Sequence, residues 1–145
     1  MEINEILEDF SSLRRNFTSF RATGDVNKEA LIEYEARFVE LKCELGPHRK
    51  LIAGQWQKYD DKAATGIKFR IAIAIHEGTL KDEDDKLVYP KCSINQAEKY
   101  ASGSDLYKTF LKNRSMYKEA LVNVADLRND MDSYINLIKD MLKTL

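Results

Sequence analysis

The C-terminal third of the chain repeats large apolar residues at intervals of seven. Seven residues are close to two turns of α-helix, so residues with this spacing share one helical face. Further apolar residues flank the repeat and make the stripe broader than a two-helix seam, which is typical of a helix that contacts more than one neighbour. The pattern predicts one long amphipathic helix over residues 105–144. Its repeat consists of Phe110, Tyr117, Val124, Met131, Ile138 and Leu145.

The length of this predicted helix bears on assembly. At a rise of about 1.5 Å per residue it spans about 60 Å, which is too long for a compact monomer of 145 residues to cover. We therefore expect a second chain to cover part of the stripe in a homo-oligomer, although the pattern fits several subunit numbers. The residues predicted to form this interface are Phe110, Tyr117, Leu121, Val124, Met131, Ile135, Ile138 and Leu142.

Two further helices are predicted before residue 76. Residues 2–21 have apolar side chains at spacings of three and four, with acidic residues in the first turns, where the helix dipole favours them. A second helix is expected to start near Val26 with Asp25 as its N-cap, and its seven-residue repeat runs from Leu31 to Tyr59. The pair Gly46 and Pro47 predicts a kink or a short break near residue 46, after which helix resumes to about residue 75.

Residues 76–92 have no helical periodicity and predict a long exposed loop. Ser93 and Gln96 then form a capping box for a short helix over 94–101. The predicted fold class is all-α, with long amphipathic helices in an extended helical hairpin and a C-terminal helix that forms an oligomeric bundle or ring. We divide the chain into residues 1–92, with the N-terminal helices, the candidate nucleic-acid-binding segment and the loop, and residues 93–145, with the oligomerisation helices, and expect the two parts to form one continuous structural unit.

Charge, cysteine content and motifs exclude several classes of protein. The net charge is −1, so no global field attracts nucleic acid or membranes. Cys43 and Cys92 lie far apart without a CxxC motif, which predicts reduced thiols in a cytoplasmic protein rather than a disulfide or a zinc site. An acidic N-terminus and the lack of a long apolar run predict neither export nor membrane insertion. No nucleophile, phosphate-binding or metal-binding motif occurs, so we predict no enzyme activity, cofactor or metal.

Residues 48–70 combine positive charge with aromatic side chains. Six Lys and Arg stand against two Asp, a local net charge of +4. Phosphates require cations along their path and unstacked bases require flat aromatic faces, so this mixture favours single-stranded over duplex nucleic acid. The alternative is that Trp56 and Tyr59 belong to the core and the basic residues are an ordinary solvated face. The candidate binding residues are Arg49, Lys50, Trp56, Lys58, Lys62, Lys68, Phe69 and Arg70.

The geometry of Lys68 and Arg70 depends on secondary structure. On a helix they point about 200° apart, so one strand of nucleic acid would not easily reach both. Apolar residues alternate from Ile67 to Ile75, and a short β-strand would bring Lys68 and Arg70 to one face. We favour a helix and keep the strand as the alternative.

The segment IKFRIAIAIHEG, from Ile67 to Gly78, resembles the basic segment of the UvsY-like recombination mediators of T4-type bacteriophages. The segment from Asp25 to Leu41 is similar to the start of that family's long helix, and the order of loop, short helix and terminal helix is the same. The resemblance covers about residues 25–145. This chain has Ile71 to Ala74 where the family tends to have aromatics, and Gly46 and Pro47 interrupt its long helix.

The resemblance implies an accessory factor that binds single-stranded DNA, loosens the single-strand-binding protein and helps to load a recombinase. It assigns DNA binding to Lys68 and Arg70, and ring-like assembly to the C-terminal helices. The leading hypothesis is therefore a homo-oligomeric recombination mediator. The alternative is a helical interaction or structural protein, such as a phage adaptor, inhibitor or scaffold, that does not bind nucleic acid.

Overall fold

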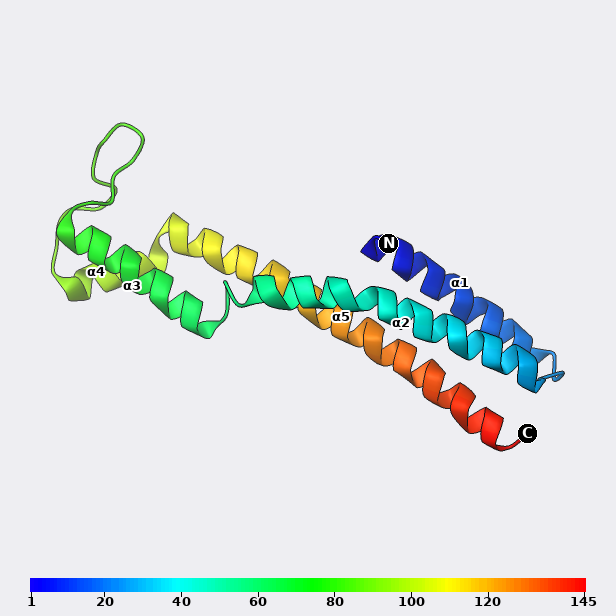
Figure 1. Ribbon diagram of the computed structural model, residues 1–145. Helices are drawn as coiled ribbons and strands as arrows, with labels where there is room; N and C mark the ends of the chain where they lie inside the picture. Colours follow the sequence, from blue (N-terminus) through cyan, green and yellow to red (C-terminus); the bar gives the residue numbers. More distant parts are fainter. The chain divides into compact units, whose positions relative to one another are not determined.

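The computed structural model describes all 145 residues and contains five α-helices (Figure 1). They are α1 (Ile3–Ala22), α2 (Lys28–Trp56), α3 (Asp61–Glu77), α4 (Ile94–Gly103) and α5 (Asp105–Lys143). No β-strand forms, so the predicted all-α class is confirmed. The helices predicted over 2–21, 94–101 and 105–144 correspond to α1, α4 and α5.

The chain divides into two compact units. The first unit comprises residues 1–52 and 121–145, and the second unit comprises residues 53–120. The boundary that we placed after residue 92 differs from this division, because α2 and α5 each contribute residues to both units. None of the five helices combines the length and the apolar composition that a membrane-spanning segment requires.

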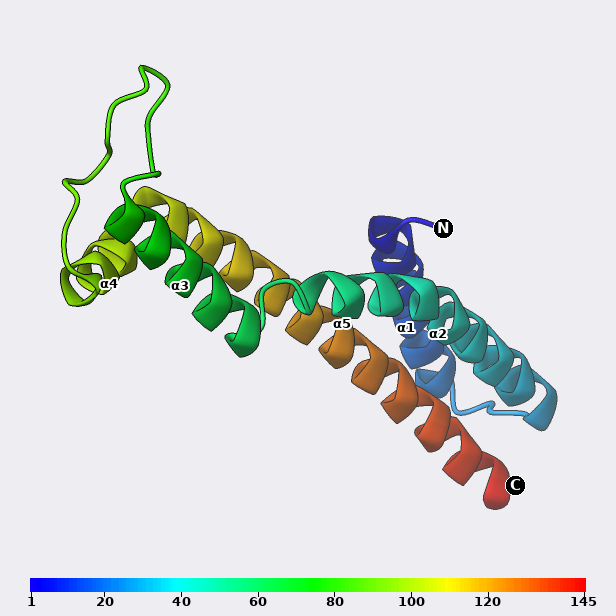
Figure 2. The ribbon, with the colours of Figure 1, turned by 60° about the vertical axis from the view of Figure 1, so that its left-hand side comes forward.

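In the first unit, α1, α2 and the C-terminal part of α5 lie side by side around one apolar core (Figures 1 and 2). Aromatic rings dominate this core. Phe38 stacks on Tyr134 with 5.1 Å between ring centroids, and Phe17 contacts both rings edge to face. Aromatic pairs of this geometry add to the stability that burial of their area provides.

The C-terminal part of the α5 stripe is covered by helices of the same chain. Val124, Met131, Ile135 and Ile138 are at most 5% exposed, and all four belong to the core that α1 and α2 share with α5. These side chains are therefore not exposed to a second chain. Their contact with another copy stays a prediction, and it requires the helices of the first unit to separate.

The start of α2 differs from the expected one. The side chain of Asn27 accepts a hydrogen bond of 2.8 Å from the backbone N–H of Ala30 and so caps the helix. The prediction of Asp25 as the cap and of a start near Val26 is therefore wrong by two residues. Asn and Asp cap helices about equally well, so the residue type alone does not distinguish the two positions.

The interruption of the long central segment also lies elsewhere. Helix α2 is continuous through Gly46 and Pro47, so the short break, one of the two outcomes expected near residue 46, does not form, and the kink stays a prediction. Pro47 has no N–H to donate to the carbonyl of Cys43. Both Cys43 and Pro47 are exposed, so water can donate a hydrogen bond to that carbonyl instead. Residues 57–60 separate α2 from α3 instead, and the Asp60 side chain caps α3 by accepting from Ala63 N–H at 2.9 Å.

In the second unit, α3 packs against α4. Small residues at their contact, Ala72 on α3 with Ala97 and Ala101 on α4, are fully buried and allow the helices to approach closely. Residues 67–75 are helical, which confirms helix over strand for this segment. Gly78 ends α3 with a left-handed φ of 72°, a conformation that favours glycine.

The connection from Gly78 to Ser93 is the predicted loop, and it projects from the ends of α3 and α4 (Figure 2). Ser93 caps α4 as predicted, because its hydroxyl accepts a hydrogen bond from Gln96 N–H, which is one of the two bonds of the expected capping box. Ser104 then separates α4 from α5. Its buried hydroxyl donates to the Ala101 carbonyl and accepts from Tyr107 N–H.

Candidate nucleic-acid interface

Because α3 is a helix, Lys68 and Arg70 point to different sides of it. Lys68 is half-buried, and its ammonium lies 6.0 Å from the centroid of the Tyr107 ring, a cation–π contact. Arg70 is exposed and forms no ion pair. The pair therefore does not form a single basic face within one chain, as the helical spacing of about 200° predicts.

The solvent-exposed side of α3 carries a different combination. Phe69 is 55% exposed, and Lys62, seven residues earlier, lies on the same helical face and is also exposed. Arg70 is next to this face. An aromatic ring that is largely exposed leaves apolar surface in water, and here one cation precedes the ring by two helical turns and another follows it directly in the chain.

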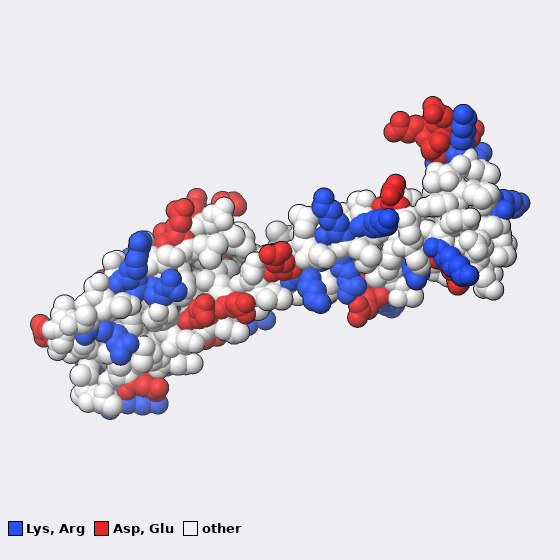
Figure 3. Space-filling model, turned by 180° about the vertical axis from the view of Figure 1, so that it is seen from behind, with Lys and Arg blue, Asp and Glu red and all other residues white.

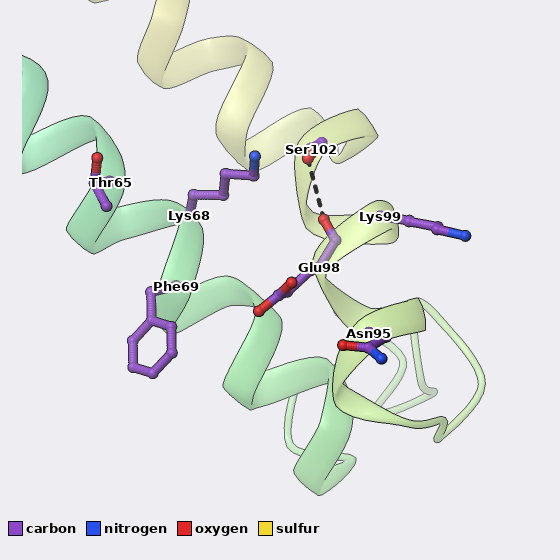
Figure 4. Close-up of a pocket in the computed structure, with 7 residues that line it drawn as sticks. All are labelled: Thr65, Lys68, Phe69, Asn95, Glu98, Lys99 and Ser102. Atoms are coloured by element: carbon purple, nitrogen blue, oxygen red, sulfur yellow. Dashed lines mark hydrogen bonds between the residues drawn. The ribbon is translucent and has the colours of Figure 1, made fainter.

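A hollow of about 610 Å³ lies between α3 and α4 beside Phe69 (Figure 4). Lys68 extends toward α4 and Lys99 extends away from α3. Glu98 is the one acidic side chain in the lining. Three of the other residues offer hydroxyl or amide groups that can donate or accept hydrogen bonds. The full lining is Thr65, Lys68, Phe69, Asn95, Glu98, Lys99 and Ser102.

The sequence hypothesis did not include the α4 side of this hollow. Residues 95, 98, 99 and 102 are spaced by three, one and three, so they share one face of α4. That spacing was visible in the sequence. It did not predict which helix lies beside this face, because the packing of α4 on α3 depends on contacts between residues that are far apart in the chain.

The structure decides between the two readings of Tyr59. Its ring stacks on Tyr117 with 4.9 Å between centroids and lies 5.1 Å from Phe110. Tyr59 is therefore a packing residue that holds the 57–60 segment against α5. Phe110 and Tyr117, which we predicted to contact another chain, pack on Tyr59 of the same chain.

Trp56 is half-buried at the end of α2. The guanidinium of Arg114 lies over its ring, 5.3 Å from the centroid, and Arg114 also forms an ion pair with Asp61. One face of the indole ring is thus occupied by a side chain of the protein. Phe69 is the aromatic residue of the predicted site with the most accessible ring.

The remaining basic residues are divided between the units. Arg49 and Lys50 lie on α2 in the first unit, whereas Lys58 lies in the 57–60 segment of the second unit. All three are exposed. Six of the eight predicted binding residues belong to the second unit, so the candidate site is described there.

The two units differ in charge. The second unit has twelve Lys and Arg against ten Asp and Glu, a net charge of +2, and the first unit has eleven against fourteen, a net charge of −3. Four of the ten acidic residues of the second unit are Asp82 to Asp85 in the projecting loop, where acidic side chains gather (Figure 3). The helical part of the second unit is therefore more basic than the unit's net charge of +2 suggests.

No protein-family model, curated protein or solved structure matches the chain. The resemblance to the UvsY-like mediators therefore depends on residues 25–41 and 67–78 and on the order of elements. The structure contains no group of three side chains that could hold a metal ion. His76 Nδ1 lies 2.7 Å from the carbonyl of Cys92, and His48 lies beside the carbonyl of Met1, so both rings contact backbone.

Proposed function

We propose that the protein binds single-stranded DNA through the second unit and acts as an accessory factor in recombination. The observation that carries this proposal is the exposed Phe69 ring at the rim of the α3–α4 hollow, with the exposed cations Lys62 two turns earlier on the same helical face and Arg70 next in the chain.

The chemistry of the surface favours a single strand. Unpaired bases have free faces that can stack on Phe69, whereas bases in a duplex are already stacked. Lysine and arginine neutralise the phosphates on either side of a stacked base. Glu98 repels phosphate, so the strand is expected to pass along the Phe69 rim of the hollow rather than over its centre.

The role in recombination comes from the resemblance alone. If the resemblance holds, the partners are a recombinase and a single-strand-binding protein, and the protein acts by binding rather than by chemistry. Its assembly into a homo-oligomer is part of the same proposal, because several copies would present several such surfaces to one strand.

The test is a titration of fluorescent oligothymidine at two salt concentrations. Phe69→Ala is expected to weaken binding roughly 5- to 150-fold, because stacking of one base contributes about 1–3 kcal/mol. Lys62→Gln with Arg70→Gln is expected to weaken binding and to flatten its dependence on salt by about two counterions. Lys68 is left unchanged, because its contact with Tyr107 gives it a structural role.

Arg15→Gln with Lys28→Gln is the matched control. It removes two exposed cations from the first unit and is expected to leave affinity within about twofold. If the Phe69 and Lys62/Arg70 variants bind as the wild type does, this site is wrong. If the wild type binds no oligothymidine even at low salt, the alternative of a helical interaction or structural protein replaces the proposal.

A further inference from the structure

A second surface with distinct chemistry lies in the first unit. A groove of about 360 Å³ runs between α2 and α5. Leu45 and Ile135 are buried and form an apolar floor, and Val39 is 39% exposed beside them. A Cβ added to Gly46 would meet nothing within 4 Å, so the groove is open at that position.

Cations line this groove and no carboxylate does. Lys42 forms an ion pair with Asp132, whereas Arg49, Arg128 and Lys139 form none. The unit that contains them has a net charge of −3, so the positive charge is concentrated at this place. An apolar floor with a rim of unpaired cations fits a ligand that is both acidic and apolar, and the lining offers no aromatic face for a nucleic-acid base.

The chain itself contains such a ligand, a small hairpin over residues 80–88 that we call the acidic hairpin. Backbone hydrogen bonds join Asp82 N–H to Lys86 O at 2.8 Å and Val88 N–H to Leu80 O at 3.1 Å. The Asp82 carboxylate accepts from the N–H groups of Asp84 and Lys86 and fixes the turn. The hairpin is therefore held in one conformation before it meets a partner, which lowers the entropy cost of binding.

The exposed side chains of the acidic hairpin complement the groove. Glu83 and Asp84 are exposed carboxylates at the turn and form no ion pair. Leu87 and Val88 follow them and are 45% and 49% exposed, although they are apolar. The same short segment thus carries the carboxylates that the groove lacks and apolar side chains that can cover its apolar floor.

We propose that the acidic hairpin of one chain docks into the α2–α5 groove of a second copy. Glu83 and Asp84 then face Arg128 and Lys139, and Leu87 covers the apolar floor. The two surfaces are different, so the contact is heterologous and generates a ring or an open chain rather than a two-fold dimer. A hairpin of this size covers less than a standard interface, so we expect weak, micromolar association that depends on salt.

Sedimentation velocity without DNA tests this, because it does not depend on the proposed nucleic-acid function. The wild type is expected to associate as concentration rises to about 0.5 mM at low salt and to dissociate at high salt. Arg128→Glu with Lys139→Glu, the groove variant, and Glu83→Lys with Asp84→Lys, the hairpin variant, are each expected to raise the dissociation constant at least tenfold.

Mixing the two variants provides the decisive result. The groove variant keeps an acidic hairpin, and the hairpin variant keeps a basic groove, so the mixture should associate although neither variant does alone. Arg15→Glu with Lys28→Glu reverses two cations elsewhere in the first unit and should associate as the wild type does. A wild type that stays monomeric at low salt, or variants that associate normally, would overturn the proposal, and circular dichroism verifies that each variant remains helical.

Discussion

At the scale of single residues, the capping side chain at the start of α2 is expected to contribute to the stability of the protein. Asn27 caps α2, whereas Asp25, two residues earlier, makes no side-chain hydrogen bond to the helix. Asn27→Ala is expected to lower the free energy of unfolding by about 1 kcal/mol, because it leaves the Ala30 N–H without its partner. Asp25→Ala is the control and should change it by less than about 0.5 kcal/mol. Urea denaturation compares the two, and equal effects would contradict the assignment of the cap.

The candidate site was partly predictable at this scale. Lys62, Phe69 and Arg70 follow from their residue types, since exposed cations beside aromatics indicate binding of nucleic acid. Tyr59 was ambiguous, because a tyrosine on a seven-residue repeat is compatible with a core and with a binding surface. Its stacking on Tyr117, 58 residues later in the chain, resolved the ambiguity, and such contacts leave no local signal.

At the scale of elements, Pro47 lies inside a continuous helix. A proline there costs about 3 kcal/mol relative to alanine, from the lost hydrogen bond and the clash with the preceding turn. Pro47→Ala is therefore expected to stabilise the protein by up to about 3 kcal/mol, measured as a rise in the urea midpoint. A loss of stability would mean instead that the first unit requires a bend that the proline imposes.

The break at residues 57–60 was not predicted, because the seven-residue repeat continues through it. The repeat includes Tyr59, so it predicts helix across residues 57–60. Asp60 offered a competing signal, since it precedes α3 and caps it, but a single Asp is a weak indicator beside a long periodic pattern. The helix boundaries at Gly78 and Ser93 were predictable, because glycine and serine end or start helices for stereochemical reasons.

At the scale of the whole molecule, two apolar cores are separated along the chain. One lies among α1, α2 and the end of α5, and the other lies between α3 and α4. The periodicity of α5 predicted that one of its faces is buried, but a pattern does not identify what covers that face. Here α1 and α2 of the same chain cover it from Val124 to Ile138.

Because the two cores are separate, a substitution that destabilises one core is expected to leave the other core folded. Phe38→Ala removes a fully buried ring from the first core and is expected to cost about 3–5 kcal/mol. Amide hydrogen exchange should then show lost protection in α1 and in residues 121–143, while α3 and α4 keep theirs. Equal loss of protection throughout the chain would show that the two units unfold together.

The junction of α4 and α5 at Ser104 limits where this chain can accept an inserted residue. One hydroxyl ends α4 and begins α5, with no spare residue between the helices. A single inserted residue there would turn α5 by about 100° relative to its cap and carry Tyr107 away from the Lys68 ammonium. The long loop before α4 can absorb insertions, whereas an insertion at this junction would break the hydrogen bonds that cap both helices, so a serine that does not line the hollow holds the start of α5 where Tyr107 meets Lys68.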